Sequence, residues 1–226
     1  MIDWHDAMEE YGCDKPDLRI PLKLKEISDL VMKEEFKVFS DPAKKEGSRV
    51  VALKVPNGNT MSRGQIDDYT KFVSKLGAKG LAYIKINDVK DLENGIQSPI
   101  LKFLNKKTIQ NIFKTLEVKT DDLIFFGAGS ESVVNLSMSS LIKKLGHDLD
   151  LYVSKWAPCW IVNFPMFELN AEGSLTPLHH PFTLPKASKK ELLENPNDVL
   201  AYAYDVVLNG LSLIHISEPT RRSYIA

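Results

Sequence analysis

An adjacent histidine pair, His179 and His180, is the feature of this sequence that most readily suggests chemistry. Pro177 and Pro181 flank the pair. Because proline fixes φ and lacks a backbone donor, the pair is expected in an extended, ordered loop. Imidazoles titrate near neutral pH, so two of them in a stiff loop suit a binding site. Residue types alone favour the plainer alternative, in which the pair has a surface-loop or capping role.

A second candidate is the charged segment G-C-D-K-P-D-L-R at residues 12–19, which contains Asp14, Lys15, Asp17 and Arg19. Aspartate and proline both favour turns, so the segment is expected to be an exposed turn. Two interpretations stay open for its charges. They form either a loop whose ion pairs satisfy one another or an active-site loop.

Length and composition narrow the function classes. The chain has 226 residues and a formal net charge of -1, which gives no global attraction to nucleic acid or membrane. Cys13 and Cys159 lie far apart, match no metal spacing and are compatible with a reducing cytoplasm. The first ten residues are acidic and do not form a signal peptide. No apolar run approaches ~20 residues, so we expect no membrane span and a cytoplasmic protein.

The expected elements indicate an α+β domain over residues 22–153, because strands and long helices alternate without a parallel βαβ rhythm. Ser62 and Gln65 form a capping box at the start of the best helix. In order, the sequence predicts a helix at 4–11, a helical face at 24–31, strands at 36–39 and 50–55, a helix at 62–77, a strand at 81–86, a short helix at 98–104, a helix at 109–116, a strand at 122–126 with a turn at 127–129, a helix at 133–145 ending at Gly146, a strand at 160–162, a polar turn at 170–174 and a strand at 201–210.

Longer strings resemble one enzyme family. W-A-P-C-W-I-V-N-F-P-M-F-E at 156–168 and H-H-P-F-T at 179–183 resemble the catalytic domain of bacterial aspartyl-tRNA synthetases, a class II family. Residues 12–19 resemble the segment that follows motif 2 there, with Cys13 in place of the usual serine. The strings at 78–85, 98–104 and 122–128 resemble the GAD domain, which is found inserted in these synthetases and in amidotransferase subunits that act on mischarged tRNA.

The resemblance implies a domain plan. Residues 1–21 and 154–210 would be pieces of a class II antiparallel-sheet catalytic domain, and residues 22–153 would be the GAD insertion domain. The family-like sequence stops at Gly210. Residues 211–226 look like the translation of a sequencing adapter, so we expect a foreign tail there and assign no role to His215 or Glu218.

The resemblance also implies the chemistry of aspartate–tRNA ligases, which act as homodimers and use aspartate, ATP, Mg²⁺ and tRNA(Asp). His179 would contact aspartate and His180 would support it. Asp205 would be a metal-binding carboxylate, but Ser212 stands where the family has its partner glutamate. Asn163 replaces an aspartate usual in the family.

Activity is not expected of the chain as written, because motifs 1, 2 and 3 and the anticodon-binding domain of the family have no counterpart in it. The first alternative is a free-standing GAD-type tRNA-binding module of an amidotransferase, and the second is an α+β protein without activity. The strings at 12–19 and 179–183 favour the synthetase over the amidotransferase.

Overall fold

The structure is a computed structural model that describes residues 1–169 and 173–213. The chain divides into two compact units. The flanking unit contains Met1–Met8, Asp14–Arg19 and the described residues from Ser154 onward, and the central unit contains Glu9–Cys13 and Ile20–Val153. The tail from residue 214 and much of the turn expected at 170–174 lie outside the described residues.

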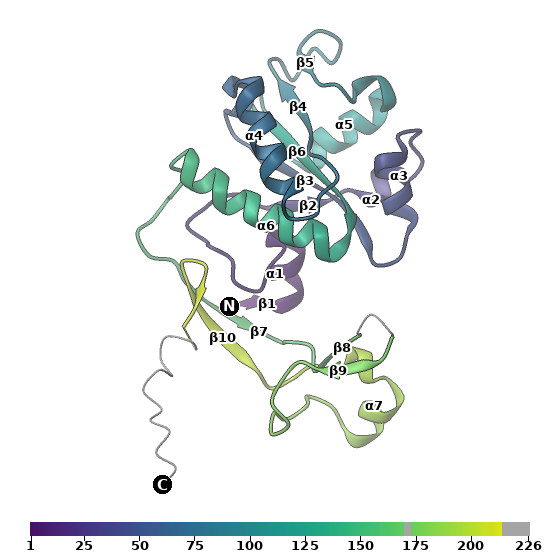
Figure 1. Ribbon diagram of the computed structural model, residues 1–226, viewed down its shortest axis with the longest axis vertical. Coiled ribbons are helices and arrows are strands. Elements are labelled where there is room, and N and C mark those ends of the chain that lie inside the picture. The colour runs from purple at the N-terminus through teal and green to yellow at the C-terminus, as the bar shows by residue number, and fades with distance from the viewer. Residues whose placement is uncertain (170–172, 214–226) are drawn as a thin grey trace. The chain divides into compact units, whose positions relative to one another are not determined.

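A five-stranded antiparallel sheet forms the middle of the central unit, with the strands in the spatial order β2-β3-β6-β4-β5 (Figure 1). The two longest strands, β3 and β6, pair along their full length, with Leu53 opposite Phe125. The strands are β2 Leu24–Glu26, β3 Ser48–Val55, β4 Ala82–Ile86, β5 Ile96–Gln97 and β6 Leu123–Ser130.

Helices cover both faces of this sheet, because successive side chains of a strand point to opposite sides (Figure 1). Val51 and Leu53 pack with residues of α4 Arg63–Ser74 and α6 Glu131–Asp148. Val50 and Ala52 pack with residues of the helices on the other face. The apolar run of β3 is therefore buried on both sides, which explains why its sequence does not alternate. The second set of helices is α2 Ser28–Val31, α3 Lys37–Lys44 and α5 Lys106–Thr115.

The start of α4 confirms the predicted capping box. Ser62 Oγ accepts a hydrogen bond from the Gln65 backbone N–H at 3.3 Å, and Gln65 Oε1 accepts one from the Ser62 N–H at 2.8 Å. Further along α4, the Tyr69 hydroxyl donates to Asp148 at the end of α6 at 3.1 Å. Burial and the charge of Asp148 raise the pKa of Tyr69 to about 12, so the hydroxyl keeps its proton and connects the two helices.

The strand predicted at residues 36–39 is wrong, because α3 occupies Lys37–Lys44. Phe39 is buried with its ring centroid 5.4 Å from that of Phe126 on the sheet. The ring of Phe36 meets Phe39 edge-on at 4.8 Å. Three apolar residues in a four-residue segment do not distinguish a strand from a helix by their period, and packing on the sheet decides the outcome here.

Other predicted boundaries also need correction. The helical face predicted at 24–31 splits into β2 and α2, and the helix predicted at 98–104 is a 3-10 turn, η2 Leu101–Phe103. The turn predicted at 127–129 lies inside β6. The helix predicted to end at Gly146 continues as α6 to Asp148, with the Ile20 side chain packed against Gly146. Among the described residues, no helix combines the length and apolar character needed to cross a membrane.

The flanking unit has its own sheet, in which the strands follow the order β1-β7-β10-β11. β1 lies parallel to β7, with Ile2 opposite Ile161, and the remaining pairs are antiparallel. Ala7, Cys159 and Val207 form its buried core with Ile161. The elements of this unit are β1 Ile2–Asp3, β7 Pro158–Val162, the hairpin of β8 Phe167–Leu169 and β9 Leu175–Pro177, α7 Lys189–Glu194, β10 Tyr204–Leu208 and β11 Leu211–Ser212. The helix α1 Trp4–Tyr11 begins in this unit and ends in the central unit.

The end of this sheet extends past the boundary expected at residue 211. Leu211 pairs with Leu208 and Ser212 with Val207, on either side of Asn209 and Gly210. The first two residues of the expected foreign tail are therefore part of a β-hairpin.

Candidate functional site

The histidine pair lies in the flanking unit, and both rings have local partners. His179 is partly buried, and its Nε2 donates to the Pro165 carbonyl at 3.0 Å, beside the edge of Phe164. His180 is exposed, and its Nδ1 accepts the Phe182 backbone N–H at 3.2 Å. These bonds place the proton of each neutral ring on Nε2. His180 thus keeps an outward N–H donor, while His179 anchors the loop.

Charged side chains of the segment 12–19 pair with one another. Lys15 pairs with Asp14 at 2.9 Å. Arg19 donates to both carboxylate oxygens of Asp17, from Nε at 2.9 Å and from Nη2 at 2.6 Å. A bidentate pair on a largely buried carboxylate fixes the loop geometry. This arrangement fits the interpretation of a salt-bridged loop. Gly210 lies close to Asp17 of this loop.

Asp205 lies on β10, opposite Ile161. Its Oδ1 accepts a hydrogen bond from the Ser212 hydroxyl at 2.8 Å. Burial raises the pKa of the neighbouring Cys159 thiol, and the charge of Asp205 adds to that effect, so Cys159 is not poised as a nucleophile.

Asp205 and Ser212 do not make a magnesium site. A hard cation prefers several oxygen ligands, whereas Ser212 directs its proton at the only carboxylate of the predicted metal pair. Across the described part of the chain, no group of three or more His, Cys, Asp or Glu side chains could hold a metal ion.

The predicted site residues come together only in part. The loop 14–19 meets the β10–β11 turn through Asp17 and Gly210. In residues 1–169 and 173–213, no hydrogen bond joins the histidine pair to Asp205 or to that loop.

Sequence reasoning missed a polar cluster around Asn163. This residue has a left-handed φ of 59°. Its amide donates to the Asp3 carboxylate at 2.7 Å and accepts from Lys186 Nζ at 2.6 Å. A neutral amide therefore links an acid and a base at the end of β7. Asp3 is 160 residues away in sequence, so no local spacing signals the contact.

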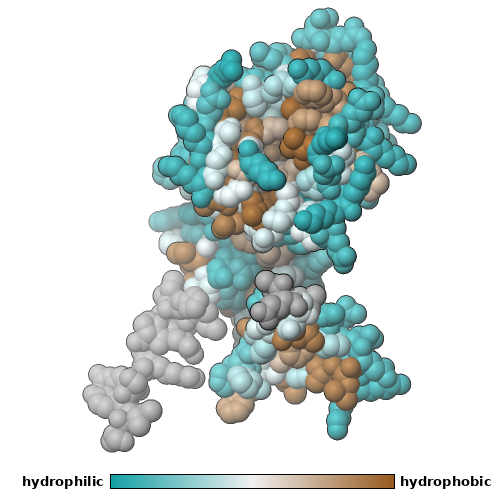
Figure 2. Space-filling model, turned by 45° about the vertical axis from the view of Figure 1, so that its right-hand side comes forward, coloured by the Kyte–Doolittle hydropathy of each residue, from teal (hydrophilic) through white to brown (hydrophobic). Residues whose placement is uncertain are grey.

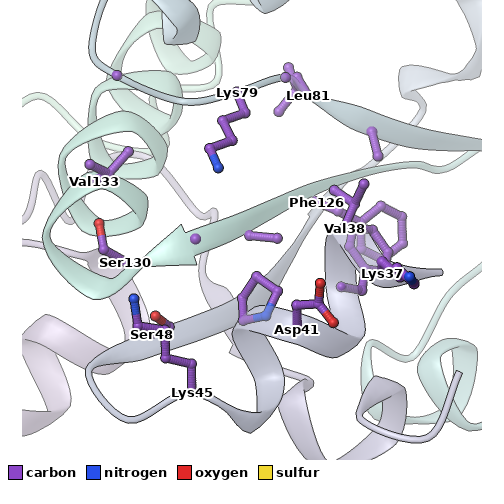
Figure 3. Close-up of a pocket in the computed structure, with 17 residues that line it drawn as sticks. Lys37, Val38, Asp41, Lys45, Ser48, Lys79, Leu81, Phe126, Ser130 and Val133 are labelled. Atoms are coloured by element: carbon purple, nitrogen blue, oxygen red, sulfur yellow. The ribbon is translucent and has the colours of Figure 1, made fainter. Parts of the chain in front are cut away.

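Sequence reasoning also missed a pocket of 780 Å³ in the central unit (Figure 3). We call it the lysine pocket, after Lys37, Lys45 and Lys79 on its walls. Asp41 is its one acidic lining residue. The floor of the pocket is apolar, and the start of α6 closes one end. The residues that line the floor and this end are Phe39, Leu81, Ala82, Phe126, Ala128, Gly129, Ser130 and Val133. The three lysines are dispersed in the sequence, where each resembles an ordinary solvated residue.

Comparison with known protein families identifies the central unit. A family model described as "GAD domain" matches residues 39–138. The chain contains a GAD domain. The match starts within α3 and ends within α6, so the sheet strands β3, β4, β5 and β6 all belong to it. The resemblance drawn from the strings at 78–85, 98–104 and 122–128 is thereby confirmed.

Among solved structures, a similar chain is the hypothetical protein PH0730 from Pyrococcus horikoshii OT3. The identity is 14%, the TM-score is 0.30, and the alignment covers 47% of this chain. It spans 58% of the length of PH0730.

The lysine pocket belongs almost wholly to the GAD domain. Only Lys37 and Val38 among its lining residues precede the match. The histidine pair, Asp205 and the loop 14–19 lie outside the GAD match and in the flanking unit.

Proposed function

We propose that this chain is part of an aspartate–tRNA ligase of the bacterial type, with the GAD domain inserted in its catalytic domain. One observation carries the proposal. β1 precedes the GAD domain and β7 follows it, yet the two strands pair in one sheet, with Ile2 opposite Ile161 and Asp3 opposite Val162. The segments on both sides of the GAD domain thus form one folding unit, which is the architecture of an insertion.

The alternative, a free-standing GAD module that helps an amidotransferase engage tRNA, has less support. Such a module needs no paired flanks, whereas the flanking unit has a buried core of its own around Ala7 and Ile161. Residues 14–19 and 179–183, which belong to the strings that favour the synthetase, lie in that unit.

In the proposed enzyme the histidine loop binds the aspartate substrate. A carboxylate accepts hydrogen bonds readily from imidazole N–H groups, and more strongly when the ring is protonated. His180 offers an exposed Nε2–H, and the bond from His179 to the Pro165 carbonyl keeps the loop in place. ATP and tRNA(Asp) complete the substrate set of the proposal, and a homodimer is its assembly. Because Asp205 and Ser212 do not form a magnesium site, no step is assigned to a metal here.

The test is ATP–pyrophosphate exchange by the protein in its natural sequence context. The proposal expects exchange that depends on aspartate and is absent with glutamate or asparagine. Glutamine-dependent amidation of aspartyl-tRNA, without aspartate-dependent exchange, would assign the chain to the amidotransferase class instead.

A further inference from the structure

The described lining of the lysine pocket has more positive than negative charge, with three lysines and one aspartate. Within the described part of the chain, Lys37, Lys45 and Lys79 form no ion pair, and Asp41 is the one acid on the pocket wall. The three lysines come from separate places in the fold: the start of α3, the turn before β3 and the loop before β4. Cations gathered from three elements around a hollow attract an anion.

The backbone at one end of the pocket adds to this attraction. Ser130 and Val133 line that end, and they belong to the first turn of α6, an 18-residue helix. Ser130 is the N-cap residue, but its side chain makes no capping hydrogen bond. First-turn N–H groups of a helix have no intrahelical acceptor, and the helix dipole favours negative charge there. In α6 the Glu131 N–H donates to the Gly47 carbonyl at 2.9 Å, and the Glu131 carboxylate lies in the first turn but not in the pocket lining. The N–H groups that follow Glu131 in this turn are therefore the ones available to a ligand. Figure 3 shows Lys79 reaching toward β6 from one side, with Lys45 close to Ser48 and Ser130 on the other.

The shape and the donor types narrow the class of ligand. Lysine ammonium groups act as point charges and suit phosphate, and the pocket lining contains no arginine fork of the kind that recognises carboxylates in a bidentate manner. A volume of 780 Å³ exceeds what a free phosphate needs and is within the range of small-molecule sites. The floor formed by Phe126, Ala82 and Ala128 is apolar and suits a flat organic group.

We propose that the lysine pocket binds the phosphate group of a nucleotide-type ligand, with the phosphate held between Lys45, Lys79 and the first turn of α6. The site lies in the GAD domain and takes no part in the aspartate activation proposed above, so either proposal can fail without the other.

The experiment titrates the full chain with AMP, adenosine, inorganic phosphate and a single-stranded RNA tetranucleotide without terminal phosphates, using calorimetry and amide NMR shifts. Lys45→Ala combined with Lys79→Ala is expected to weaken AMP binding about tenfold or more, since each lysine loses a charge-assisted contact. The matched control is Lys107→Ala combined with Lys114→Ala, which removes the same charge from α5 outside the pocket and is expected to change AMP binding less than about threefold.

A third variant, Asp41→Asn, keeps the test sensitive should the double variant fold poorly. Removing the one acid on the wall is expected to tighten AMP binding, by about twofold to tenfold at low salt. Binding by the tetranucleotide and not by AMP, lost with the same two lysines, would identify an RNA strand as the source of the phosphate. Adenosine binding as tight as AMP, equal losses in the two double variants, or no saturable binding by any probe would overturn the proposal.

Discussion

Glu34 shows how one buried side chain can stabilise a distant element. Its side chain accepts hydrogen bonds from Thr108 Oγ1 at 2.6 Å and from the Asn105 N–H at 3.0 Å, at the start of α5. Burial acts to raise the pKa of Glu34, but the hydrogen bonds from Thr108 and Asn105 outweigh it and the pKa is lowered. The carboxylate therefore satisfies the backbone N–H of Asn105, the N-cap residue of α5, and ties the Thr108 hydroxyl in the first turn to the same acceptor.

Glu34→Gln is expected to lower the free energy of unfolding by about 1–3 kcal/mol at pH 7. The reason is that the NH2 group of the new amide is a donor and would face the donors of Asn105 and Thr108. A group with a lowered folded pKa stabilises fully above its unfolded pKa of about 4.3 and loses that contribution as pH falls through the folded value. Urea melts of both proteins between pH 7 and pH 3 should converge at the acid end. A constant difference across that range would contradict this role.

In the proposed enzyme the two histidines are expected to differ on substitution. His180→Ala should raise the KM for aspartate about tenfold or more and leave the KM for ATP unchanged, because the Nε2–H of His180 is the donor available to the substrate and a charge-assisted contact is worth about 1.5–3 kcal/mol. His179→Ala should cost less, because the Nε2–H of His179 already donates to the Pro165 carbonyl. The resemblance predicts the opposite order, with His179 as the aspartate contact and His180 as its support. Pyrophosphate exchange with aspartate and ATP varied separately distinguishes the two.

Strands and helices with strong local signals are predictable from this sequence. The capping box of α4 and the apolar run of β3 are local, and both occur where expected. The glycines of β6 mislead, because glycine usually marks a turn. Gly127 instead lies in the strand beneath Met138, where a side chain would have no room. Such a close approach depends on the position of α6, which no local pattern shows.

Gly127→Ala tests this account of β6. The added Cβ would lie 2.7 Å from Met138 Cγ and 2.9 Å from its Sδ. Because a packed core resists extra volume, we expect a loss of about 1–3 kcal/mol in the free energy of unfolding. The control is Gly64→Ala in α4, where the nearest atom is 3.9 Å away, and it should be neutral or gain up to about 1 kcal/mol. Equal effects in the two variants would show that the close contact with Met138 is unimportant.

The candidate site is less predictable than the fold. The residue types and the resemblance select His179, His180 and Asp205, but they do not reveal that Asn163 links Asp3 to Lys186, because the contact joins opposite ends of the chain. The sequence does not predict the lysine pocket, for a related reason. Its cations are dispersed in sequence, and only the folded sheet and α6 bring them around one cavity.

The central unit should fold without the rest of the chain, because its sheet is buried on both faces. Residues 9–153 should be more stable than residues 22–153 by about 1–3 kcal/mol. The longer piece keeps the Glu9 carbonyl that accepts from the Arg49 guanidinium at 3.1 Å, and it keeps Ile20 in the core. Thermal melts of both pieces, with amide NMR spectra, check this. A random-coil spectrum for residues 9–153 would contradict it.

The proposed insertion of the GAD domain depends on one structural feature, which is that the segments before and after this domain form one sheet. A chain with Cys13→Ser and Cys159→Ala can carry a new pair, Asp3→Cys and Val162→Cys, at positions that lie opposite each other on β1 and β7. Paired strands hold such residues within the Cα distance of about 4.4–6.8 Å that a disulfide spans. The control carries Asp3→Cys alone in the same background, so that position 3 has no partner thiol at position 162.

The measurement is non-reducing electrophoresis with mass spectrometry, after mild oxidation of the folded chain at low concentration and a protease cut engineered inside the GAD domain. If β1 and β7 pair, the amino-terminal and carboxy-terminal fragments stay joined by a disulfide between positions 3 and 162, while the control fragments separate. Separation of the fragments in the test pair, in a chain that retains its folded spectrum, would contradict the insertion and with it the proposed synthetase.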